Sequence, residues 1–117
     1  MTAPSECLFC RIAAGEIPSD RVHEDEELVA FRDIAPRAPV HILLIPRQHI
    51  TSAAELTAAD GPLLGRLFEL AAELARREGV AESGFRIVTN TGPAAGQSVA
   101  HLHFHLLGGR TFSWPPG

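Results

Sequence analysis

The sequence predicts an α+β fold with a mostly antiparallel sheet. Strand-like runs occur in consecutive groups around one long amphipathic helix, instead of alternating regularly with helices. Glycine, proline or acidic residues separate these runs. A chain of 117 residues can bury a core but has no room for a second domain, so residues 1–117 are expected to form one domain.

The first elements are a short helix and a pair of strands. Residues 7–14 (CLFCRIAA) are typical of a short helix that Gly15 ends. Residues 21–24 and 28–32 have the composition of strands. The acidic residues 25–27 between them suit a hairpin turn.

A buried strand and the long helix come next. Residues 40–45 (VHILLI) form a short apolar run bounded by prolines, which favours a strand over a helix. Thr57 and Asp60 resemble a capping pair before leucines that recur at helical spacing. Arginines in the last turn suit the helix dipole, and Gly79 is a natural C-terminal stop.

The C-terminal third returns to strand patterns. Residues 85–89 predict a strand, residues 92–96 a loop, and residues 100–107 the last strand. The prolines of the tail, residues 114–117, exclude a helix or an inner strand.

Composition and charge exclude several classes of function. The net charge of -4 argues against broad binding of nucleic acid or anionic membranes, yet leaves open a small phosphorylated ligand held by backbone N–H groups. No apolar run approaches a membrane span, and residues 1–6 do not resemble a signal peptide, so we expect a cytoplasmic protein. In a reducing compartment Cys7 and Cys10 indicate a metal site or a redox pair.

Three histidines alternate with apolar residues in the last predicted strand. On a strand, His101, His103 and His105 would share one face, and the apolar residues between them would face the core. A polar solvent-facing strand is disfavoured, because such strands normally use Thr, Ser, Lys or Glu. Either the histidines bind a catalytic zinc ion, or one imidazole is a nucleophile. The small-residue loop 92–98 just before them could close around an anion.

These residues resemble the HINT branch of the histidine triad superfamily. The triad pattern is residues 101–107 (HLHFHLL), and the resemblance covers essentially the whole chain in order. The other matching segments are residues 17–18, 24–25, 31–36 (FRDIAP), 45–50 (IPRQHI), 90–92, 96–98 (GQS) and 108–117.

The resemblance implies a purine nucleoside phosphoramidase, which cleaves the P–N bond between a nucleoside 5′-phosphate and an amine. It implies a homodimer in which two five-stranded antiparallel sheets join. His103 matches the nucleophile, which would form a nucleotidyl-histidine intermediate that water hydrolyses. His105 and the backbone of Gly96, Gln97 and Ser98 would stabilise the phosphate, and the Ser98 hydroxyl would meet the leaving group.

Other positions match the nucleotide pocket of that family. Asp33 matches the acid that binds the ribose hydroxyls, although a plain turn aspartate would explain it without the family. The implied base pocket comprises Phe9, Ile12, Phe31 and Ile34. Asn90 looks like a residue that positions the phosphate loop, and His41 matches a fourth histidine near the triad. His23 matches nothing and is read as a surface residue, and Arg32 departs from the histidine that relatives often carry.

The resemblance also implies a metal site and a role for the tail. Cys7, Cys10, His49 and His101 match a closed zinc site of structural type, with a reduced thiol pair as the alternative. Trp114 lies in the tail, residues 110–117, which in this branch crosses the dimer and borders the partner's site. We therefore expect Trp114 to influence which amine is accepted.

Three hypotheses follow for the activity. The first is a hydrolase acting on purine nucleoside 5′-phosphoramidates or aminoacyl adenylates. The second is a purine nucleotide-binding regulator whose turnover is incidental. The third is a zinc metallohydrolase that uses the three strand histidines, and it alone predicts that a chelator abolishes activity.

Overall fold

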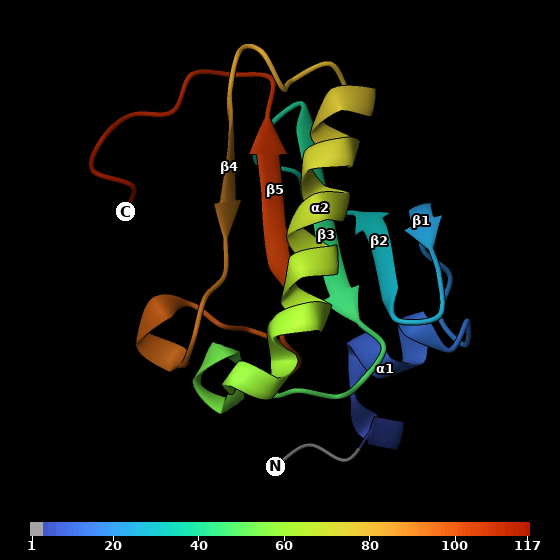
Figure 1. The fold of residues 1–117 in the computed structure, drawn as a ribbon. Helices are drawn as coiled ribbons and strands as arrows, with labels where there is room; N and C mark the ends of the chain where they lie inside the picture. Colours follow the sequence, from blue (N-terminus) through green and yellow to red (C-terminus); the bar gives the residue numbers. More distant parts are fainter. Residues whose placement is uncertain (1–3) are drawn as a thin grey trace.

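A five-stranded antiparallel sheet in the order β1-β2-β3-β5-β4 organises the computed structural model, which describes residues 4–117 (Figure 1). The strands are β1 (Arg21–Glu24), β2 (Leu28–Arg32), β3 (Val40–Pro46), β4 (Phe85–Val88) and β5 (Phe104–Gly108). The α-helices are α1 (Leu8–Ala13) and α2 (Gly61–Arg77), and 3-10 turns cover Pro4–Glu6, Ala53–Glu55, Ala58–Asp60 and Pro93–Ala95. The predicted fold class, with one long and one short helix, is confirmed.

The two faces of the sheet are covered by different helices. Ile42 and Leu44 of β3 belong to the core cluster that contains the buried face of α2. Leu43 and Ile45 belong to the cluster that contains Phe9 and Ile12 of α1. Burial on both faces explains why β3 is an almost continuous apolar run, since each buried leucine or isoleucine contributes about 1.5–3 kcal/mol.

The long helix is delimited largely as its sequence suggests. The N–H of Thr57 donates to Oδ2 of Asp60 at 2.9 Å, but this pair caps the 3-10 turn Ala58–Asp60, and α2 begins only at Gly61. At the other end Gly79 has a φ of +75°, a conformation that favours glycine and lets the chain reverse.

The last strand begins later than predicted. β5 starts at Phe104 instead of residue 100, because the backbone groups just before it are bonded elsewhere. The N–H of Leu102 donates to the carbonyl of Ile50 at 2.6 Å, and the carbonyl of His101 accepts from the His103 ring at 2.7 Å. The alternation nevertheless persists, because Leu102, Phe104 and Leu106 lie in the core cluster of α2.

The C-terminal tail leaves β5 and lies outside β4, the edge strand of the sheet (Figure 1). The guanidinium of Arg86 donates to the carbonyl of Ser113, and those of Arg86 and Arg110 lie 5.1 and 4.2 Å from the centre of the Phe112 ring. The tail contains no helix or strand, as predicted. Trp114 is 83% exposed.

Among residues 4–117, none of the helices has the length and apolarity to cross a membrane.

Candidate active site and metal-ligand cluster

A mostly apolar cavity of about 350 Å³ lies beside α1, the end of β2 and the residues that lead into β5. This volume suits a small organic ligand. Eight of the predicted site residues line it: Phe9, Ile12, Phe31, Asp33, Ile34, Ser98, His103 and His105. Six others do not: His41, Asn90, Gly96, Gln97, His101 and Trp114.

The cavity also has walls that the residue patterns did not single out for binding. Leu8, Leu43 and Val99 complete its apolar surface, together with Ile17 and Pro18. Only the last two carried a signal, as part of the family resemblance. A pocket lining built from scattered apolar residues has no pattern of its own, because the same residue types fill any core.

His103 is held in one tautomer by the backbone. Its Nδ1 lies 2.7 Å from the carbonyl oxygen of His101, and a carbonyl only accepts, so Nδ1 carries the proton. In the neutral form of the ring, the lone pair therefore lies on Nε2. The imidazole is 5% exposed, and its ring centre lies 5.0 Å from that of Phe9, almost perpendicular to it. This is the arrangement that a nucleophilic imidazole requires.

His105 is held in the opposite tautomer through His41. The N–H of Arg37 donates to Nδ1 of His41 at 3.0 Å, so His41 carries its proton on Nε2. That Nε2 lies 2.9 Å from Nδ1 of His105 and donates to it. His105 is thereby left with a proton on Nε2. Two neighbouring rings, with centres 5.2 Å apart, thus combine a free lone pair with a hydrogen-bond donor.

Burial lowers the pKa of two histidines beside the cavity, His105 and His41. Burial is the main cause that lowers the pKa of His105 to about 4, and the neighbouring His103 and His41 lower it further. Burial likewise lowers the pKa of His41, which Asp33 opposes only in part. His105 is therefore a neutral donor at pH 7, and its Nε2–H can donate to an anionic oxygen.

Asp33 lies directly after β2 in a turn. Its Oδ1 accepts from the N–H of Ala35 at 2.8 Å, and Oδ2 lies 3.4 Å from Nε2 of His41. Ile34 lines the cavity yet is fully exposed at 101%, so it lies at the open rim. Arg32 directs its guanidinium to Glu78, at 2.6 Å between Nη1 and Oε1, and this bond lowers the pKa of the Glu78 carboxyl.

The loop before the triad offers fewer backbone N–H donors to an anion than predicted. The N–H of Gly96 donates to the carbonyl of Pro93, and the N–H of Gln97 to that of Gly92. Within the described chain, the N–H of Ser98 makes no such bond. Of the three predicted backbone donors, Ser98 is therefore the one available to a ligand.

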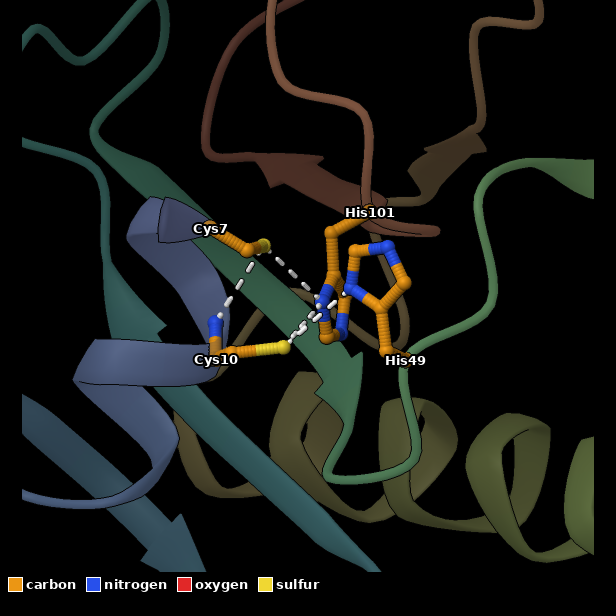
Figure 2. Close-up of side chains that lie close together, drawn as sticks. All are labelled: Cys7, Cys10, His49 and His101. Carbon is orange, nitrogen blue, oxygen red and sulfur yellow. Dashed lines mark hydrogen bonds between the residues drawn. The ribbon is translucent and has the colours of Figure 1, made fainter. Parts of the chain in front are cut away.

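A cluster of cysteine and histidine side chains lies next to the cavity, between α1, the end of β3 and the triad (Figure 2). Nδ1 of His101 lies 3.4 Å from the sulfur atoms of both Cys7 and Cys10, and Nδ1 of His49 lies 3.2 Å from Cys10 Sγ. All four ligand atoms lie within 4.8 Å of one another. The predicted metal ligands therefore meet in space.

The donor set and spacing fit a tetrahedral ion. In a tetrahedral zinc site, ligand atoms about 2.0–2.3 Å from the metal lie roughly 3.5 Å from one another, close to the separations found here. The Nε2–H of His101 donates to the carbonyl of Pro46 at 2.8 Å, which directs the Nδ1 lone pair at the thiols. Nε2 of His49 is buried without a hydrogen-bond partner among the described residues. Burial and the adjacent Cys7 raise the pKa of the Cys10 thiol to about 11, so an incoming metal would displace its proton.

The three triad histidines are divided between the metal-ligand cluster and the cavity. His101 belongs to the metal-ligand cluster and is completely buried, whereas His103 and His105 line the cavity. This geometry does not bring all three histidines together around one catalytic metal, because His101 directs its free nitrogen towards the cysteines. The arrangement instead presents a ring nitrogen with a free lone pair and a hydrogen-bond donor beside an apolar pocket. His23 lies apart with Asp25.

The chain is similar to several known proteins. Residues 14–112 match the HIT domain family. The chain is 50% identical to an adenylylsulfatase of Arabidopsis thaliana over 115 residues, which cover 97% of this chain and 78% of that protein. It is 48% identical over 105 residues to the purine nucleoside phosphoramidase of Escherichia coli K12, covering 90% of this chain and 88% of that one. A 14 kDa zinc-binding protein of Brassica juncea is 49% identical over 114 residues, covering 96% and 100%.

The fold agrees with solved structures of the same kind. The crystal structure of a HIT family hydrolase from Legionella pneumophila Philadelphia 1 superposes with a TM-score of 0.93 at 50% sequence identity, covering 95% of this chain and 99% of that one. This likeness over nearly the full length of both chains confirms the resemblance derived from the triad and its flanking segments. The chain therefore belongs to the HIT domain family.

Proposed function

We propose that the protein is a hydrolase that cleaves the P–N bond of purine nucleoside 5′-phosphoramidates, or the adenylyl bond of aminoacyl adenylates, through a nucleotidyl intermediate on His103. The observation that carries the proposal is the pair of opposite tautomers: His103 with a free lone pair on Nε2 and His105 with a proton there. The relatives named phosphoramidase and adenylylsulfatase support the same class of chemistry.

In the first step Nε2 of His103 attacks the α-phosphorus and the P–N bond breaks, with its electron pair leaving on the amine nitrogen. In this proposal the Ser98 hydroxyl hydrogen-bonds the departing nitrogen, which takes a proton from solvent as it leaves. The N–H groups of His105 and Ser98 would bind the phosphoryl oxygens as charge develops on them. Water then attacks the phosphorus and releases a proton to solvent, the bond to His103 breaks, and a nucleoside 5′-monophosphate is released with the imidazole restored.

The remaining contacts belong to the nucleoside. We assign Asp33 to the ribose hydroxyls, because its carboxylate lies at the cavity wall and is 19% exposed. Phe9, Ile12, Phe31 and the rim residue Ile34 would enclose the purine. Asn90 lies outside the cavity lining, and we propose no contact between it and the nucleoside.

We also propose a structural zinc ion held by Cys7, Cys10, His49 and His101. Such an ion would join α1 to the sheet and supply no open position for substrate. Its influence on the site would pass through His101, whose carbonyl holds the proton of His103. The proposal further includes a homodimer in which the tail, residues 110–117, borders the partner's cavity.

The first experiment is steady-state hydrolysis of adenosine 5′-phosphoramidate by wild type and His103→Ala, with AMP binding measured in parallel. We expect turnover to fall by at least about 10³-fold in the variant while AMP still binds. A folded wild type that binds AMP without turnover would contradict the hydrolase and favour the regulator. Activity abolished by a chelator in a protein that stays folded would instead favour the metallohydrolase.

A further inference from the structure

The side-chain amide of Gln97 has all its hydrogen-bonding groups occupied by the backbone. Its Oε1 accepts from the N–H of Gly92 at 2.9 Å, and Nε2 donates to the carbonyls of Thr51 at 2.8 Å and Val99 at 3.0 Å. The orientation of the amide is unambiguous, because an N–H lies on one side and two carbonyls on the other. Gln97 does not line the cavity, and both of its N–H donors are already used by the backbone, so none is left for a phosphate.

These bonds hold together the parts that shape the phosphate end of the cavity. The backbone N–H of Gln97 returns to the carbonyl of Gly92 at 3.1 Å, so the loop is closed twice between the same two residues. Ser98 and Val99, which follow directly, line the cavity. The bond to Thr51 ties the loop to the segment beside His49, and the neighbouring Ile50 accepts from Leu102 of the triad region at 2.6 Å.

We propose that Gln97 is a positioning residue that sets the place of the Ser98 N–H and hydroxyl for the 5′-phosphate, without itself touching the nucleotide. The inference deepens the proposed function, on which its reference to a nucleotide rests. Reactions at phosphorus depend chiefly on alignment, so a loop displaced by a fraction of an ångström weakens contacts to the phosphate and leaves contacts to the nucleoside intact.

The test compares two ligands that differ only in the phosphate. We would measure the Kd of AMP and of adenosine by calorimetry for wild type, Gln97→Met and the matched control Gln48→Met, which changes the other, exposed glutamine. Methionine keeps the length of the side chain, adds no charge and makes none of the three bonds. We expect the AMP Kd of Gln97→Met to rise about tenfold with the adenosine Kd within twofold, and the control to match wild type.

Three results would overturn the inference: unchanged AMP affinity in Gln97→Met, equal loss of both ligands, or a wild type that binds neither. Failure of the hydrolase proposal looks different, because a wild type that binds AMP but does not turn over phosphoramidate still allows the two affinities to be compared. With active protein, the positioning role further predicts that kcat falls more than KM rises.

A measurement on wild type covers the case in which the variant does not fold. We expect the side-chain amide protons of Gln97 to exchange slowly with solvent, both alone and with AMP bound, while the Ser98 amide resonance shifts with AMP and not with adenosine. Rapid exchange of the Gln97 protons on AMP addition would mean that this side chain leaves the backbone to bind the nucleotide, which would overturn the positioning role.

Discussion

At the scale of single residues, one backbone carbonyl and one backbone N–H determine the chemistry of the site. The carbonyl of His101 holds the proton of His103, and the N–H of Arg37 directs that of His41 and, through it, of His105. The triad pattern predicts which histidines share a face. It says nothing about tautomers, because that of His105 depends on Arg37 through His41 and that of His101 on Pro46, and both residues are distant in sequence from the triad.

The low pKa of His105 leads to a prediction about pH. Its pKa is lowered from 6.5 to about 4 by burial and by His103 and His41, while Asp33 acts in the opposite direction. His105 is thus neutral above that value, and its Nδ1 can accept from His41. We expect the His105 ring to stay neutral from pH 8 to about pH 5 and to take up a proton at Nδ1 only as pH approaches 4, when the hydrogen bond from His41 is lost.

The measurement is the 15N chemical shift of the His105 ring nitrogens by NMR between pH 4 and 8. A folding control by circular dichroism at each pH separates titration from unfolding. A His105 ring that titrates near 6.5, the ordinary value for histidine, would contradict the role of a buried neutral His105.

At the scale of elements, local sequence patterns predicted the helices and strands whose bounds depend on residues close by in the chain. The helices and the first three strands lie close to their predicted bounds, since apolar periodicity and glycine stops act within a few residues. The start of β5 was predicted wrongly, because residues 101–103 bond to Ile50 and to a side chain instead of a neighbouring strand. The meeting of Cys7 and Cys10 with His49 and His101 came from the family resemblance, as no local pattern links segments that far apart.

The position of α1 leads to a prediction about metal. Cys7 caps this six-residue helix, and both cysteines face histidines from elsewhere in the chain. We expect wild type purified without chelator to contain about one zinc per chain and the Cys7→Ser/Cys10→Ser variant to contain none. Its Tm should fall by about 5 °C or more, because α1 would lose the metal coordination proposed to join it to the sheet.

Catalysis should survive in that variant, with kcat within about tenfold of wild type below the lowered Tm, since the ion offers substrate no open position. Metal content is measured by elemental analysis and Tm by calorimetry, with Ser98→Ala as a variant that leaves the ligands intact. Metal retained by the double variant would contradict the ligand assignment, and equal Tm values would contradict a structural role.

At the scale of the whole molecule, the exposed tail is the feature that a single chain leaves unexplained. Trp114 is 83% exposed and does not line the cavity of its own chain. β4 pairs only with β5 within the described chain, and each of its residues is partly exposed. A second copy joined at this edge would extend the sheet and bring the tail to a neighbouring cavity, as the proposed homodimer requires.

If Trp114 acts on the partner's site, a dimer of two differently defective chains should contain one complete site. Trp114→Ala should alter kcat/KM among phosphoramidates of different amines by about tenfold while AMP affinity stays within twofold, because only the leaving group meets the tail. Mixed dimers of Trp114→Ala with His103→Ala contain one site that combines an intact His103 with an intact Trp114 from the other chain. That site should recover the wild-type order of amine preference, measured after the subunits are mixed and the dimer mass is checked by light scattering. A preference that stays that of Trp114→Ala would mean that Trp114 acts within its own chain or not at all.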